Sequence, residues 1–563
     1  MATVKLKTTI PHVTSRIRTA SRRWLRFIAD VFRQPIVIAI LLSSVFYVLI
    51  ARHNAAVAFS MPTDESLHKL SVLLKLSFWI VLATMIYSLI IFIKKIRSGN
   101  IFFRRWLLYF SLYFAVLFAV FLLIHPGHWV WDEFNILEVV KTYTPYAWQN
   151  YFTNVYYTFC LLLFPSAISI VVVQITLIAI IVGYIAAVVR SLTKHKYAPY
   201  LLMSIFLLPP ILINNLYPLR ITLYSYAEIL LFAYLLNSYI KNKLKITPKG
   251  MVFVFFLIGI LAFWRSEGIY YLLLVPVLLI TSNLINKNNW KDFSTHAILT
   301  PSYLVLAVLG IVTYISNDSR YAITTMINPL SVMIHEPLRG GKLQEKLADM
   351  NKTIDLDVLR AYPSHTEIPS YWNNLLRPDY TGGLKSFRSD YAYIVAHNPD
   401  YFLKARIKTF LATNGLTKEY PPVLPVGLLG RDGELSASEK IVAQHFVETN
   451  AFTKPLNPQA KQFFTDALLG IDKQDKLTPI GHVFWNLIIP ILLLLIVFMH
   501  SIKKRHTFWV VACIFILLRI PIIFITAPAS YFMYYLPVYI SGFTIPLIYL
   551  LIHSRKLNPA KVK

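Results

Sequence analysis

Residues 166–189 read SAISIVVVQITLIAIIVGYIAAVV, 24 residues without a charged side chain. About 20 mostly apolar residues, wound as a helix, are needed to cross the roughly 30 Å hydrocarbon core of a bilayer. A run of this length and composition therefore predicts a transmembrane helix.

Similar windows recur along the chain, which has 563 residues, 56% of them hydrophobic and only 15% charged. A soluble protein of this composition would expose apolar surface and aggregate. We therefore predict an all-α polytopic membrane protein with about twelve transmembrane helices. The predicted spans are 35–51, 70–93, 106–124, 166–189, 200–217, 221–240, 251–264, 269–285, 297–315, 482–500, 507–526 and 534–552, with 152–164 as a juxtamembrane helix.

The formal net charge is +28, and the basic residues that produce it are distributed as the predicted topology requires. Lys and Arg gather in alternate loops, as in Lys94–Arg105, Arg190–Lys196, Lys241–Lys245 and Lys503–Arg505, whereas the intervening short loops carry few. Because cytoplasmic loops are enriched in basic residues, this asymmetry predicts that both termini lie in the cytoplasm of a bacterial cell (inner) membrane protein. No basic stretch accompanies a folded reader of bases, so nucleic acid is not expected as a partner.

The spans divide the chain into regions. We expect a basic cytoplasmic segment at 1–34, a transmembrane hairpin at 35–94 and a transmembrane module at 95–315 whose first outer loop is 125–152. An extracytoplasmic domain at 316–481, transmembrane helices at 482–552 and a basic tail at 553–563 follow.

The interval 316–481 is too long for a structureless loop in a compact protein, so it should fold. Asp390–Ala412 has helical spacing of apolar residues, interrupted at Asn398-Pro399, where one helix should end and another begin. Ser436 and Glu439 form a capping-box pattern before 440–447. The domain should be mostly helical.

Several ionisable residues fall at the predicted outer face. They are Asp132 and Glu133 in the loop HPGHWVWDEFN (125–135), Arg220 in one outer turn, Arg265 and Glu267 in the next, and Arg519 inside the window 507–526. A charged group costs roughly 2.5–3.5 kcal/mol at mid-membrane, so such groups usually face a cavity or a partner. The alternatives are solvated loop charges, a structural Arg265–Glu267 ion pair, and arginines that extend to the interface.

Aromatic and histidine side chains accompany these charges. Tyr531 and Tyr534 could support a sugar site, although interfacial belts are commonly aromatic too. His128 could assist in binding a metal, although lone loop histidines usually have no such role. The two cysteines, Cys160 and Cys513, show no disulfide or metal-ligand spacing. A divalent metal is compatible with the acidic pair, but the sequence does not require one.

These residue types suit chemistry on a phosphate. The fork of an arginine matches phosphate oxygens, and a nearby carboxylate suits general-base work on a hydroxyl. Together with access from lipid, they predict a reaction between a group linked to a lipid phosphate and an acceptor outside the membrane.

The chain resembles the GT-C superfamily of integral-membrane glycosyltransferases, which includes protein O-mannosyltransferases and the aminoarabinose transferases of lipid A. The resemblance rests on the acidic pair Asp132-Glu133 in the first large outer loop, on the juxtamembrane stretch Thr144–Phe164, and on the Arg-x-Glu-Gly turn at Arg265–Gly268. The segments His397–Arg406 and Tyr531–Tyr539 are similar to poorly characterised bacterial proteins of this type. This chain departs from the pattern because its acidic loop follows the third predicted span, which makes 35–94 look like an added hairpin.

The resemblance implies transfer of a sugar from a polyprenyl-phosphate donor to a glycan, lipid or protein acceptor, with inversion of the anomeric centre. Asp132 would be the general base and Glu133 would orient the acceptor or bind a metal. Arg265 and Arg519, and less directly Arg220, would hold the donor phosphate, with Glu267 positioning Arg265. The alternatives are an oligosaccharide polymerase or ligase, which needs no acidic pair, and a transporter or flippase, which would place charges near the bilayer midplane.

Overall fold

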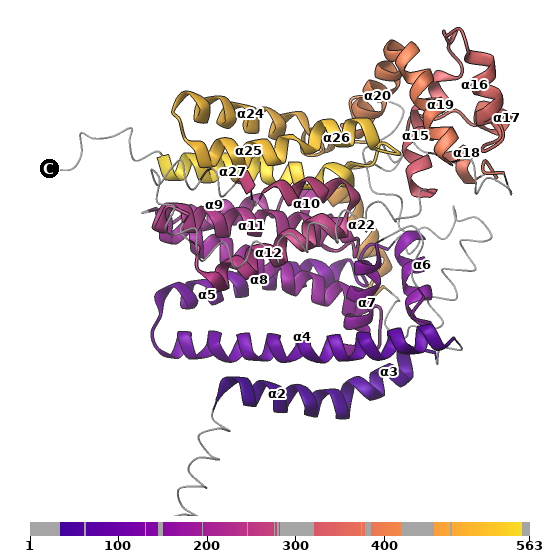
Figure 1. Ribbon diagram of the computed structural model, residues 1–563. Coiled ribbons are helices and arrows are strands. Elements are labelled where there is room, and N and C mark those ends of the chain that lie inside the picture. Colours follow the sequence, from indigo (N-terminus) through magenta and orange to yellow (C-terminus); the bar gives the residue numbers. More distant parts are fainter. Residues whose placement is uncertain are drawn as a thin grey trace, which may run out of the picture. The chain divides into compact units, whose positions relative to one another are not determined.

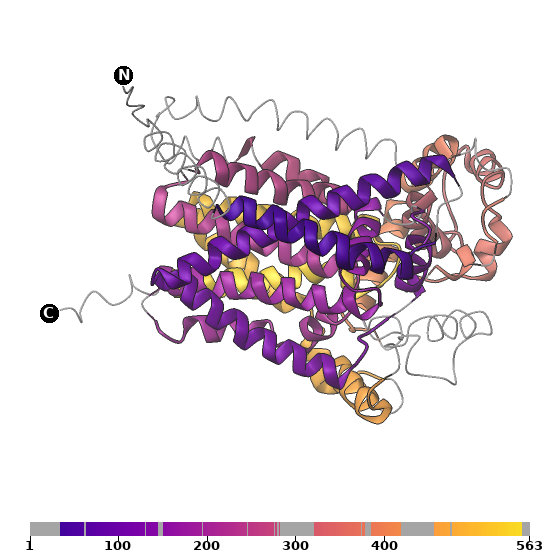
Figure 2. The ribbon, with the colours of Figure 1, turned by 90° about the horizontal axis from the view of Figure 1, so that it is seen from below.

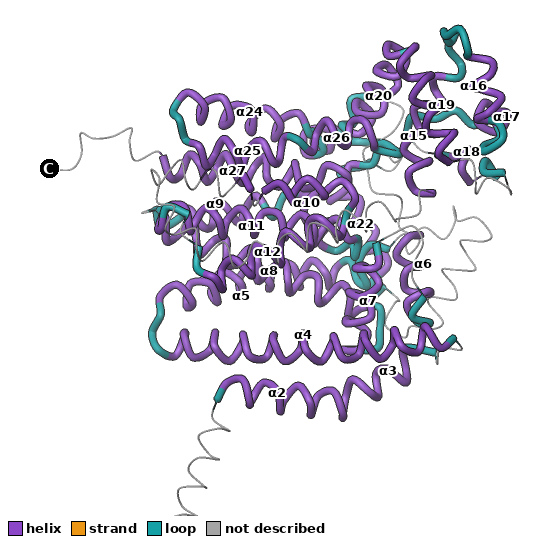
Figure 3. The backbone as a smooth tube through the Cα atoms, in the orientation of Figure 1, coloured by secondary structure: helices purple, strands orange, loops and turns teal. Residues whose placement is uncertain are grey.

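The computed structural model describes residues 34–60, 64–129, 131–144, 150–193, 195–244, 246–274, 276–277, 281, 320–366, 368–372, 374–377, 384–417, 455–472 and 476–553. In this part of the chain every named element is a helix, and the pairing of extended backbone is limited to two isolated bridges (Figure 3). The prediction of an all-α protein is confirmed for these residues. Outside them lie the capping box at Ser436–Glu439, the span 297–315, most of 269–285, and all but one residue of the predicted segment 1–34 and of the predicted tail 553–563.

Seven described helices are long and apolar enough to cross a membrane: Pro35–Ala58, Glu65–Arg97, Ile101–Leu123, Ile168–Leu192, Pro479–Lys503, Thr507–Thr526 and Phe532–His553. A bent pair, Ala198–Ile205 with Pro209–Asn215, is apolar and long enough only when its two helices are taken together, as a broken span or a re-entrant loop. The chain is thus a membrane protein by the length and composition of its helices. The described residues do not reach the predicted twelve spans, and α12 (Pro248–Trp264) falls among the shorter apolar helices.

The chain divides into two compact units, and the first comprises 1–104, 140–144 and 155–165. Here α2 (Pro35–Phe46) continues through η1 (Tyr47–Ala51) into α3 (Arg52–Ala58) and packs against α4 (Glu65–Arg97). Trp79 of α4 donates a hydrogen bond to Ser44 at 3.2 Å, and Asp64 caps the start of α4. Asn54 donates to the carbonyl oxygens of Leu162 and Leu163, both at 2.9 Å.

The second unit comprises 105–139, 145–154 and 166–563. Its helical bundle holds α5 (Ile101–Leu123), α8 (Ile168–Leu192), α11 (Arg220–Asn242), α12, α24 (Ile488–Lys503), α25 (Thr507–Leu517), α26 (Arg519–Thr526) and α27 (Leu536–His553) (Figure 1). Helix α11 packs against α8, α12 and α27. Glycines allow two close contacts, since a Cβ on Gly183 would meet the backbone of Phe110 and a Cβ on Gly542 would meet that of Pro490.

One predicted span of the second unit is broken. The window 200–217 is not a single helix, because α9 (Ala198–Ile205) and α10 (Pro209–Asn215) meet at an angle of 73°. Pro209 and Pro210 begin α10, and a proline ring excludes the helical backbone and hydrogen bond of the preceding turn. The Phe206 carbonyl at the break accepts a hydrogen bond of 2.8 Å from the Tyr113 hydroxyl, which satisfies a group that lipid could not.

At one end of this bundle α15 (Arg320–Met333), α16 (Leu343–Met350), α17 (Leu356–Ala361), α18 (Pro369–Trp372), α19 (Leu384–His397) and α20 (Pro399–Thr413) gather into what we call the polar domain. It has a core of its own, centred on Ile327, Met350, Leu359 and Phe387. The helix break predicted at Asn398-Pro399 is confirmed.

A buried arginine ties the polar domain to the bundle. The Arg406 side chain, on α20, donates to the carbonyl oxygens of Phe524 at 2.5 Å and Ala527 at 2.8 Å, near the end of α26. It also donates to the side chain of Asn328 at 3.0 Å. Burial removes water from the guanidinium and lowers the pKa of Arg406. The three acceptors take the place of that water.

Candidate functional site

The acidic pair begins a helix. Asp132 and Glu133 stand in the first turn of α6 (Trp131–Val140), where the helix dipole favours negative charge. Glu133 is fully buried, whereas Asp132 is partly exposed. A buried carboxylate does not fit the alternative of a solvated loop charge, so for Glu133 the structure favours a role inside the fold.

The loop before α6 is held against the turn that precedes α11. The His128 backbone donates to the Leu216 carbonyl at 3.0 Å, and the His128 ring meets the Tyr217 ring edge-on at 5.5 Å. Gly127 has φ +103° and approaches the Leu216 carbonyl so closely that a Cβ would lie 2.8 Å from it. The structure thus brings the acidic loop to the segment that leads into Arg220.

The second predicted pair is in contact. Arg265 Nε donates to Glu267 Oε1 at 2.5 Å, and the Arg265 and Glu267 side chains are 4% and 13% exposed. Burial alone would raise the pKa of Glu267, but the charges of Arg265 and Arg519 and the hydrogen bond from Arg265 outweigh it, and the pKa falls to about 2. Glu267 therefore stays ionised, and it holds Arg265 as predicted for a positioning group.

The start of η2 (Ser266–Leu273) fixes this pair. A Cβ on Gly268 would collide with the Leu261 carbonyl and lie 2.6 Å from the Tyr224 hydroxyl. Just before the pair, Trp264 donates to Thr153 at 3.1 Å. The Arg265 guanidinium carbon lies 5.9 Å from the centre of the Tyr534 ring, so one of the predicted aromatic residues lies beside it.

Arg519 has partners that the sequence did not reveal. Its Nη2 donates to Glu228 Oε2 at 3.0 Å and to the Tyr224 hydroxyl at 2.5 Å, and its side chain is 0% exposed. Ser541 of α27 lies 3.5 Å from the other oxygen of Glu228. Arg519 thus faces α11, and the alternative of an arginine extending to the interface is wrong for it.

One face of α11 joins the two groups. Arg220, Tyr224 and Glu228 stand four residues apart, so they form a stripe along about 12 Å of one helix face. The only sequence signal for Glu228 was its position as an acidic residue inside the apolar window 221–240. An acidic group there implies a partner, but the partner lies 291 residues further along the chain.

The remaining predicted residues are placed as follows. Tyr531 precedes η5 (Phe532–Tyr535), with its ring centre 6.3 Å from that of Tyr534. In the described part of the chain no three His, Cys, Asp or Glu side chains form a group that could hold a metal ion.

The charged residues fall into two groups. The loop before the acidic pair contacts the turn that leads into Arg220, and Arg265 and Arg519 are each held against a carboxylate, Glu267 on η2 and Glu228 on α11. Comparisons of the chain with protein-family models, with curated proteins and with solved structures found no match.

Proposed function

We propose that this protein is a membrane glycosyltransferase that moves a sugar from a polyprenyl-phosphate donor to a glycan, lipid or protein acceptor on the extracytoplasmic face. The observation that carries the proposal is the contact of the acidic loop with the turn before α11, through His128 and Leu216. That contact joins the loop before the acidic pair to the turn that leads into α11, the helix whose Glu228 is paired with Arg519.

Asp132 is the proposed general base, since it is the more exposed carboxylate of the pair. It takes the proton of an acceptor hydroxyl while that oxygen attacks the anomeric carbon. The bond from this carbon to the phosphate oxygen breaks, and the polyprenyl phosphate leaves with the electron pair. Glu133, which is fully buried, orients the acceptor indirectly, by holding the first turn of α6 that carries Asp132.

Arg265 and Arg220 are the arginines best suited to the donor phosphate. Nη2 of Arg519 donates to Glu228 and Tyr224, so Glu228 balances the charge inside the bundle, while Nε and Nη1 are buried without an acceptor among the described residues. We assign it the role of holding α11 in place rather than of touching phosphate. Arg265 keeps contact with Tyr534 as well as Glu267, and its guanidinium can donate charge-assisted hydrogen bonds to phosphate oxygens.

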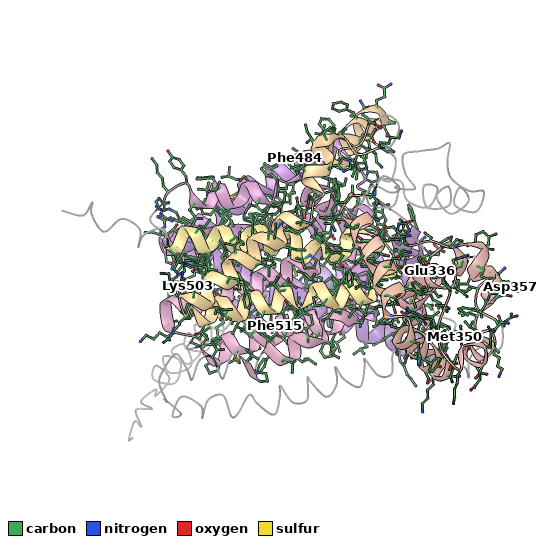
Figure 4. All side chains as sticks on the ribbon, turned by 90° about the horizontal axis from the view of Figure 1, so that it is seen from above. Glu336, Met350, Asp357, Phe484, Lys503 and Phe515 are labelled. Carbon is green, nitrogen blue, oxygen red and sulfur yellow. The ribbon has the colours of Figure 1, made fainter. Side chains whose placement is uncertain are left out.

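The proposed topology places the polar domain outside the cell (inner) membrane of a bacterium and both termini in the cytoplasm. In Figure 4, Lys503 lies at the end of the second unit away from Glu336, Met350 and Asp357 of the polar domain. Lys503 belongs to the basic turn Lys503–Arg505, and such turns favour the cytoplasmic side.

The test is sugar transfer by the full chain in nanodiscs, with undecaprenyl-phosphate sugars as donors. Asp132→Asn should lower turnover by about 10²–10⁴-fold, the range for loss of a general base, without changing the thermal midpoint. Asp357→Asn, a side chain 90% exposed in the polar domain, is the matched control and should be neutral. Undiminished transfer by Asp132→Asn would favour the polymerase or ligase instead.

A transporter is the second candidate, because two observations favour it. The broken span α9–α10 and the buried ion pair Glu228–Arg519 are features of substrate pathways in transporters. Uptake of a lipid-linked sugar into proteoliposomes without any transfer product would favour a transporter and reject the glycosyltransferase.

A further inference from the structure

A lysine is buried in α22 (Pro458–Leu469) without an acceptor. Lys461 is 6% exposed, and its Nζ has no hydrogen-bond partner in the described part of the chain. A buried ammonium group is costly unless it is paired. Burial lowers the pKa of Lys461 to about 8, so the group is still mostly charged at neutral pH.

A hydroxyl group stands one turn further along the same helix. Thr465 is four residues after Lys461, on the face that also carries the buried Leu469. Its Oγ1 is likewise buried and without a partner among the described residues. One face of α22 therefore offers a cation and a hydroxyl to something that accepts hydrogen bonds.

The helix that packs against α22 adds acceptors. Helix α10 ends at Asn214 and Asn215, both fully buried, and their amide oxygens have no partner in the described structure, nor has that of Gln174 on α8. The amide nitrogens are occupied, for Gln174 Nε2 donates to the carbonyls of Asn215 at 2.9 Å and Tyr217 at 2.7 Å. Buried polar atoms usually have partners, so these five point to a polar ligand.

Exposed apolar residues surround α22 and the helix that follows it, α23 (Pro479–Phe484), which together we call the lobe. Leu456, Phe463, Ile480 and Val483, on or beside α22 and α23, are 65%, 67%, 66% and 61% exposed. The lobe, orange in Figure 2 and marked by Phe484 in Figure 4, projects from the side of the bundle. Exposed apolar groups beside a span that begins at Pro479 fit lipid.

We propose that Lys461 and Thr465 form a second phosphate site, apart from the Arg265 and Arg220 site of the proposed function, for a lipid-linked sugar whose hydroxyl groups donate to Asn214, Asn215 and Gln174. Naming the sugar rests on the proposed function, whereas the phosphate site does not. The site adjoins the proposed catalytic loop, because Asn215 is followed by Leu216, which accepts the hydrogen bond from His128.

The test measures binding to the full chain in nanodiscs with three probes: undecaprenyl phosphate, undecaprenol and glucose 1-phosphate. Lys461→Met should weaken undecaprenyl phosphate binding about tenfold to a hundredfold, the loss expected for a hydrogen bond to a charged group. Thr465→Val should weaken it less, and Lys408→Met, an exposed lysine of the polar domain, should not. Undecaprenol should bind far more weakly than its phosphate.

The pH dependence separates a direct contact from a structural role. Only the protonated amine attracts phosphate, so wild-type affinity should fall about tenfold from pH 7 to pH 9, as Lys461 loses its proton near pH 8. Lys461→Arg, which stays charged, should bind with little pH dependence. This variant also answers the case in which Lys461→Met fails to fold.

Equal affinity of Lys461→Met and wild type would overturn the phosphate site, as would equal binding of undecaprenol. Equal affinity for glucose 1-phosphate would overturn the assignment to a lipid-linked ligand. Loss of binding in Lys461→Met without sugar transfer by the wild type would keep this site and reject the glycosyltransferase. Sugar transfer by Lys461→Met with unchanged affinity for undecaprenyl phosphate would keep the glycosyltransferase and reject the phosphate site at Lys461.

Discussion

Glu228 accepts a hydrogen bond of 3.0 Å from Arg519 in the interior of the helical bundle, and neither side chain is more than 2% exposed. The two residues join α11 to α26, which also ends at the carbonyls bound by Arg406. A single helix is thus fixed at one end to the membrane bundle and at the other to the polar domain.

Unpairing this buried pair should be costly. Glu228→Gln leaves the Arg519 charge uncompensated and should lower the free energy of unfolding by about 3–5 kcal/mol. The double variant Glu228→Gln with Arg519→Met should recover most of the loss. Denaturant unfolding in detergent, followed by tryptophan fluorescence, measures both. Glu336→Gln breaks the surface pair with Lys404 and should cost at most about 1 kcal/mol; a similar cost at Glu228 would contradict the buried pairing.

Acid should remove the stabilisation of the folded state that Glu267 provides. Its pKa is about 2 in the fold against 4.5 ordinarily, so the stability it adds is complete above about pH 4.5 and is lost as pH falls towards 2. The thermal midpoint of Glu267→Gln should therefore lie below that of wild type at pH 7, and the difference should shrink between pH 4.5 and 2. A difference that does not change with pH would mean that the ion pair adds nothing.

Removing the Arg406 contacts should loosen the polar domain. Arg406→Met leaves the carbonyls of Phe524 and Ala527 without their donor, at about 1–3 kcal/mol for each buried group. Limited proteolysis within 320–417 should become about tenfold faster or more. Arg388→Met removes an exposed arginine of α19 and serves as the control, and equal cleavage rates in the two variants would reject the anchoring role.

The proposed topology predicts opposite labelling of two lysine positions. A membrane-impermeant maleimide should modify Lys385→Cys in spheroplasts, but modify Lys503→Cys only after the membrane is opened. Both lysines are exposed, whereas the native Cys160 and Cys513 are buried and should react little. Labelling of both positions from the same side would reject the predicted orientation.

The sequence predicts the local features well. Long, mostly apolar windows predicted the seven long apolar helices, and Asn398-Pro399 predicted the break between α19 and α20, because each signal depends on neighbouring residues alone. The 73° bend also has a local signal, Pro209-Pro210, but the apolar window 200–217 was predicted as one span because its length and composition were given more weight. Proline weighs more than apolar length in such a window.

The contacts of the site could not be predicted in the same way. Glu228 and Arg519 are separated by 291 residues, and nothing in either neighbourhood names the other. Lys461 gave no signal, since a lysine in a polar interval is ordinarily solvated. Arg265 and Glu267 were found because they are two residues apart on one short turn.

The bend between α9 and α10 bears on how the protein is made. A bent segment is costly where its backbone faces lipid, and α27, the last helix that the structure describes, packs against α9 and brings Ser541 to Glu228. A ribosome reaches α27 only after more than 300 further residues, so the earlier helices must wait in the bilayer with an acidic group and a broken segment still uncovered. Completion of the core is then a post-insertion event, and chains that stop before α27 should be removed by membrane quality control.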